Sequence, residues 1–114
     1  ELSVEAWIRP DSLDMPNRES SGYVHWMGKG VSGEHEWVSR MYQQGNSEDR
    51  ENRISFYSFN LSGGLGAGSY FQDDVTVGGW VHFEGTFDDN PPSGVAMNEG
   101  SVISINGGAP KSSV

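Results

Sequence analysis

The chain has 114 residues, which is enough for one domain and allows only a small hydrophobic core. Its formal net charge is -9, from 7 basic and 16 acidic residues, and this balance argues against nucleic acid and anionic membranes as partners, because binding either depends on neutralising its charge. The chain contains no cysteine, which excludes a disulfide framework, a thiolate nucleophile and a zinc–thiolate site.

Aromatic rings have to supply much of the core. Leu, Ile, Val and Phe together make only 23 of the 114 residues, a low fraction for a folded domain. The 13 aromatic residues compensate, because each ring buries a large apolar area. We therefore expect a thin core with most of the rings inside.

The first predicted strand covers residues 2–9. Apolar side chains stand at every second position, from Leu2 to Ile8, which is the period of a half-buried β-strand, and Pro10 and Asp11 end it. Trp7 falls on the alternate positions with Ser3 and Glu5. Its ring is therefore expected to point away from the main core.

Six further strands are expected along the chain, at residues 23–27, 36–43, 54–59, 69–72, 80–87 and 102–105. Turn-forming residues separate them, and no segment has the apolar spacing of a helix. The glycine-rich segment Ser62–Gly68 is expected to be a bent connection or bulged edge, because a phosphate-binding loop would be followed by a helix. Seven short strands at this spacing predict a single antiparallel β-sandwich over residues 1–114.

Four segments resemble the laminin-G-like, concanavalin A-like jelly-roll domains of the bacterial type. They are SVEAWIRP (3–10), GYVHWMGKG (22–30), RISFYSFNLSGGLGAGSYFQD (53–73) and GWVHFEGTFDD (79–89). The resemblance implies a non-catalytic module of an extracellular or cell-surface protein that binds carbohydrate or protein, in some members with calcium. Relative to that family the pattern is truncated at both ends, which would leave open sheet edges. We therefore expect a homodimer or a higher homo-oligomer.

Three functions remain open on the sequence. The first is recognition of a carbohydrate or protein ligand, with Trp7, Trp26 and Tyr70 as candidate contacts, because a flat aromatic ring suits the apolar face of a sugar. The second is a self-assembling scaffold fragment without a small ligand. The third is a diverged glycoside hydrolase using Glu34 and Glu36, since such enzymes need two carboxylates on one face.

Calcium is a possible cofactor, and a metal site assembled from histidines of different strands also stays open. Two acidic turns could supply oxygen ligands, although adjacent aspartates at a strand end usually form turns. The candidate ligands are Asp73, Asp74, Asp88, Asp89 and Asn90. The three histidines do not have metal-binding spacing along the chain. His82 matches a strand histidine of the jelly-roll family and is expected to pack and to form a hydrogen bond.

Overall fold

The computed structural model describes residues 1–15, 21–31, 33–60, 66–88 and 101–106, with the side chains of 101–105 excepted. These residues form seven strands and no helix. The strands are β1 (Leu2–Ile8), β2 (Tyr23–Lys29), β3 (Trp37–Tyr42), β4 (Ile54–Ser58), β5 (Ala67–Tyr70), β6 (Val81–Phe87) and β7 (Ser101–Ile105). All seven predicted strands are confirmed, with ends that move by no more than two residues.

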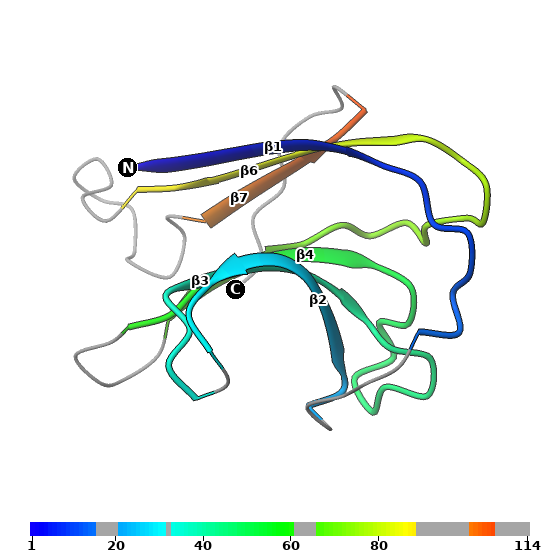
Figure 1. Ribbon diagram of the computed structural model, residues 1–114, viewed down its shortest axis with the longest axis horizontal. Helices are drawn as coiled ribbons and strands as arrows, with labels where there is room; N and C mark the ends of the chain where they lie inside the picture. The colour runs from blue at the N-terminus through cyan, green and yellow to red at the C-terminus, as the bar shows by residue number, and fades with distance from the viewer. Residues whose placement is uncertain (16–20, 32, 61–65, 89–100, 107–114) are drawn as a thin grey trace.

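The strands form two antiparallel sheets. One sheet has the order β1-β6-β7 and the other the order β2-β3-β4-β5. Figure 1 shows the two sheets as separate layers that face each other. The chain is therefore all-β, with an arrangement compatible with the predicted β-sandwich. No helix in the described part of the chain is long and apolar enough to cross a membrane.

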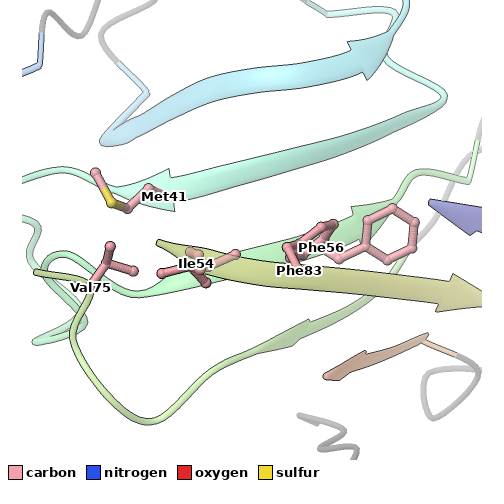
Figure 2. Close-up of a cluster of buried hydrophobic side chains, with 6 residues drawn as sticks. Met41, Ile54, Phe56, Val75 and Phe83 are labelled. Carbon is pink, nitrogen blue, oxygen red and sulfur yellow. The ribbon is translucent and has the colours of Figure 1, made fainter. Parts of the chain in front are cut away.

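The space between the sheets is filled by aromatic and aliphatic side chains together. Phe56 of β4 and Phe83 of β6 are fully buried, with ring centroids 6.4 Å apart. Trp26 lies edge-on to Phe83 at 5.1 Å, and Trp37 lies 6.1 Å from Phe56. The buried cluster consists of Met41, Ile54, Phe56, Val75, Val81 and Phe83 (Figure 2). The expectation of an aromatic core is confirmed in part: these rings lie inside, but four of the six buried residues are not aromatic, and Trp7 and Trp80 are exposed.

Two strand glycines make room for aromatic rings. Gly85 of β6 is buried, and a Cβ atom there would lie 2.8 Å from Phe56 Cγ and 2.9 Å from Phe83 Cζ. Gly68 of β5 pairs with Tyr57, whose ring occupies the place of its missing side chain. The predicted connection Ser62–Gly68 is therefore wrong at its end, since β5 already includes Ala67 and Gly68; residues 61–65 lie outside the described part of the chain.

Candidate functional site

The outer face of the three-stranded sheet presents two exposed tryptophans among polar side chains. We call it the tryptophan face, and define it as Ser3, Glu5, Trp7 and Arg9 on the β1 side with Trp80, His82, Glu84 and Thr86 on the β6 side. In the register of this strand pair Trp7 lies opposite His82 and Glu5 opposite Glu84. The opposite face of β1 points into the core, so the orientation predicted for Trp7 is confirmed.

Trp7 is held in place although it is 65% exposed. Its indole packs on the imidazole of His82, with ring centroids 4.7 Å apart and an interplanar angle of 31°. His82 Nε2 in turn lies 2.7 Å from Glu5 Oε1, within hydrogen-bonding distance. Because Glu5 fixes the imidazole, the indole that packs on it has a defined position with one face toward solvent.

Trp80 is the second exposed indole, at 62%. It directly precedes β6, and the guanidinium carbon of Arg9 lies 5.8 Å from its ring centroid. Arg9 also forms an ion pair with Asp11 at 3.2 Å. Trp80 was not among the predicted contact residues, although it shares strand parity with His82 and so belongs to the polar side of the strand.

A cavity of about 310 Å³ lies beside Trp80. Its lining combines apolar residues with polar ones, namely Ile54, Phe71, Val75, Val81, Gly79, Trp80, Asp73, Asp74, Thr76 and Asn106. The volume falls at the lower end of small-ligand pockets, which span roughly 300–1,000 Å³. Trp80 belongs to both the tryptophan face and the cavity lining, so the two candidate sites adjoin at this residue.

Asn106 connects the cavity wall to the tryptophan face. Its side-chain Oδ1 accepts a hydrogen bond from the backbone N–H of His82 at 2.8 Å, and its own N–H donates to the His82 carbonyl at 2.8 Å. The φ of 51° at Asn106 lies in the left-handed region that asparagine tolerates. Asp74, on the rim, lies 3.5 Å from Arg53 Nε, an ion pair without a well-formed hydrogen bond.

The outer face of the four-stranded sheet carries arginines stacked on tyrosines, unlike the tryptophan face. We call it the tyrosine–arginine face, and define it as Tyr23, His25, Arg40, Tyr42, Arg50, Ser55, Tyr57 and Tyr70. Arg40 is only 8% exposed, and its guanidinium carbon lies 3.8 Å from the Tyr23 centroid and 5.0 Å from that of Tyr57. Arg40 Nε donates a hydrogen bond to Ser55 Oγ at 3.1 Å.

A second arginine, Arg50, covers another tyrosine of this face, Tyr70. The guanidinium carbon of Arg50 lies 4.2 Å from the Tyr70 centroid, and Arg50 Nη1 donates to the Tyr42 hydroxyl at 3.1 Å, which raises the pKa of Arg50. Arg50 also pairs with Glu48 at 3.0 Å. Glu48 accepts a hydrogen bond from Tyr23 at 2.6 Å. Burial first, and this hydrogen bond second, raise the pKa of Tyr23 to about 12.

The predicted contact residues are thus separated by the fold. Trp7 lies on the tryptophan face and Tyr70 on the tyrosine–arginine face, where Arg50 covers its ring. Trp26 belongs to neither, because its ring packs in the interior against Phe83 and its Nε1 is buried without an acceptor. The predicted carboxylate pair is also outside the cavity lining: Glu36 forms an exposed ion pair with Lys29 at 2.8 Å, and Glu34 is exposed.

The candidate metal ligands are dispersed as well. Asp73 and Asp74 line the cavity and Asp88 follows β6, whereas Asp89 and Asn90 lie outside the described residues. Among the residues that the structure describes, no three His, Asp or Glu side chains are arranged to hold a metal ion. Two histidines do meet, His25 and His35, whose ring centroids are 4.9 Å apart, while His82 lies on the other sheet. Calcium binding stays a prediction.

No family model, curated protein or solved structure matches this chain. The resemblance to laminin-G-like domains is therefore a prediction that these comparisons leave unconfirmed. The two sheet faces and the cavity are therefore the features that indicate a function.

Proposed function

We propose that the chain is a non-catalytic carbohydrate-recognition module, and that a saccharide lies along the tryptophan face with one end in the cavity beside Trp80. The observation that supports this most is the pair of exposed indoles on one sheet face, Trp7 at 65% and Trp80 at 62%. Large apolar side chains grouped on the surface commonly mark an interaction site, whereas single ones need no explanation.

The chemistry of the face suits a sugar. A sugar ring has an apolar C–H face and an edge of hydroxyl groups, so it needs a flat aromatic surface together with hydrogen-bonding neighbours. Trp7 is positioned before binding by His82, which reduces the entropy lost on binding. The carboxylates of Glu5 and Glu84 lie on the same face and can accept hydrogen bonds from sugar hydroxyls.

The cavity supplies the second half of the site. Asp73, Thr76 and Asn106 place polar groups around its rim, and the indole of Trp80 forms part of its wall. A space of about 310 Å³ suits one sugar residue rather than a longer chain. The proposal therefore places one end of the saccharide in the cavity and the following residue over Trp7.

The tyrosine–arginine face is less suited to stacking with sugars. A ring can stack on a sugar only where its face is open, and guanidinium groups already cover Tyr23 and Tyr70. We also propose the finer fold that the sequence suggests, which is a laminin-G-like jelly roll. In that family the domain belongs to a bacterial extracellular or cell-surface protein.

Glycan-array screening followed by isothermal titration calorimetry tests the proposal. The variants Trp7→Ala and Trp80→Ala should each weaken binding of an array-positive saccharide about tenfold or more, as loss of an interface tryptophan typically does. Phe59→Ala is the matched control, because Phe59 is 36% exposed and contacts His35 and Tyr57, away from the tryptophan face. An array without any bound glycan, or wild-type affinity in both tryptophan variants, would overturn the proposal.

The self-assembling scaffold is the second candidate, favoured by the open edge of β1 (Leu2–Ile8). Among the described strands, this seven-residue strand pairs only with β6. Its other edge therefore offers backbone groups that a second copy of the chain could pair with. We propose a homodimer or a higher homo-oligomer on this basis. Such pairing is compatible with glycan binding, because an added strand would lie in the plane of the sheet, whereas the side chains of the tryptophan face point out of that plane.

A further inference from the structure

Arg40 differs from the other arginines of the described part of the chain. Each of the others lies within 3.5 Å of a carboxylate oxygen, in the pairs Arg9–Asp11, Arg50–Glu48 and Arg53–Asp74. Arg40 has no such partner among the described residues, although at 8% exposure it is the most buried charged residue of them. The arginine that most needs a counter-charge is thus the one without it.

The contacts of Arg40 only partly compensate for its burial. A buried charge is costly unless it is paired and hydrogen-bonded. Stacking on Tyr23 at 3.8 Å and Tyr57 at 5.0 Å provides attraction to the ring faces but satisfies no N–H group. A guanidinium has five N–H donors, and the described residues provide one acceptor, Ser55 Oγ, for the Nε donor.

The same contacts restrain the orientation of the Arg40 guanidinium. The tyrosine rings restrain its plane, and the hydrogen bond to Ser55 fixes its Nε edge, so the two terminal Nη groups are left to bind a ligand. These groups present parallel N–H bonds that match the spacing of two oxygens of a carboxylate or sulfate. Arg40 belongs to β3, with β2 and β4 on either side, so a ligand there would lie across the middle of the sheet.

We infer that Arg40 binds the carboxylate or sulfate group of an acidic saccharide on the tyrosine–arginine face. This second site lies on the opposite side of the molecule from the tryptophan face (Figure 1). The inference rests on the proposed function only in taking the ligand to be a saccharide. The net charge of -9 repels anions in general, so we expect binding to depend on the fork of Arg40 rather than on diffuse attraction.

The test compares ligands that differ only in charge. Calorimetry at low ionic strength measures binding of a short oligogalacturonate, of the same oligosaccharide with its carboxylates converted to methyl esters, and of a heparin-derived oligosaccharide for the sulfate arm. The wild-type protein should bind at least one acidic probe about tenfold more tightly than the ester, because hydrogen bonds between charged groups are roughly twice as strong as neutral ones.

Three variants assign the effect to Arg40. Arg40→Gln should weaken the acidic probe about tenfold or more, and Arg40→Lys should weaken it less, since lysine keeps the charge but loses the fork. Lys29→Gln is the matched control, because it makes the same change in net charge at an exposed residue that belongs to neither of the two faces. If Arg40→Gln fails to fold, as a melting scan would show, Arg40→Lys and the acid–ester comparison in the wild type decide the question.

The outcomes separate this inference from the proposed function. Equal binding of acid and ester overturns the Arg40 site. Loss of acid binding in Lys29→Gln or Trp7→Ala but not in the Arg40 variants also overturns it. If neutral glycans bind through Trp7 and acidic glycans bind no more tightly, the Arg40 site is also overturned. That result would leave the carbohydrate-recognition proposal in place. Acid-selective binding that needs Arg40 but not Trp7 supports the site even if the tryptophan face binds no sugar.

Discussion

Gly85 offers the sharpest test of how the two sheets pack. It lies in the middle of β6, opposite Val4 of β1 and Ile103 of β7, at a position where alanine would ordinarily favour a strand over glycine. The substitution Gly85→Ala adds one methyl group directed at the rings of Phe56 and Phe83. We expect it to destabilise the fold in spite of its favourable backbone effect.

The size of the effect follows from the distances. A Cβ at residue 85 would lie 2.8 Å from Phe56 Cγ and 2.9 Å from Phe83 Cζ, closer than carbon atoms approach without displacement. Both rings are fully buried, so neither can move into solvent. Overpacking of this kind typically costs about 1–3 kcal/mol. For a domain of this size each kcal/mol lowers the Tm by roughly 4 °C, so we expect a decrease of roughly 4–12 °C.

Thermal unfolding followed by circular dichroism, with urea denaturation for the free energy, measures the effect. Gly79→Ala is the control, because its added Cβ would meet the exposed side chain of Thr76 at 3.1 Å, which can rotate away. It should change the Tm by much less. A Gly85→Ala protein that melts with the wild type or above it would refute the argument that the Phe56 ring occupies the space beside Gly85.

Three other predictions concern the surface of the molecule. Tyr23 should ionise at a pKa of about 12 in an alkaline absorbance titration. Glu48→Gln should lower this pKa toward but not to 10.0, because burial is the larger cause of the shift. Since the pKa is raised in the folded state, the stability contributed by Tyr23 is present below pH 10 and lost as the pH rises to about 12. Lys29→Ala should change the free energy of unfolding by less than about 1 kcal/mol, because its ion pair with Glu36 is exposed, and a larger loss in urea denaturation would contradict this. Light scattering at micromolar concentration should give a mass of two or more chains if the free edge of β1 is paired by a second copy, and a mass of one chain would count against it.

The strands were predictable from the sequence because each depends on local patterns. In β1 the alternation of apolar and polar residues assigns Trp7 and Glu5 to the outer face, and the structure confirms this. Trp80 was not among the predicted contact residues, although its parity with His82 and Glu84 places it on the polar side of the strand.

The surroundings of Arg40 could not be predicted from local sequence patterns. Residues 38–42 are buried on both faces of β3, so the period of two that marks an open face is absent there. Whether the arginine meets a carboxylate depends on which strands lie beside β3 and in which register. The stacking partners Tyr23 and Tyr57 come from β2 and β4, and neither is close to Arg40 along the chain.

The sequence by itself determined the seven strands, the absence of helix among the described residues and the outward direction of Trp7, since these follow from side-chain alternation and turn residues within a few positions. The tertiary structure alone decided the candidate sites. The cavity joins the segment that contains Asp73 with Trp80 and the more distant Asn106, and the Arg40 site joins three strands. Such sites depend on long-range strand pairing, which fixes distances that no local pattern contains.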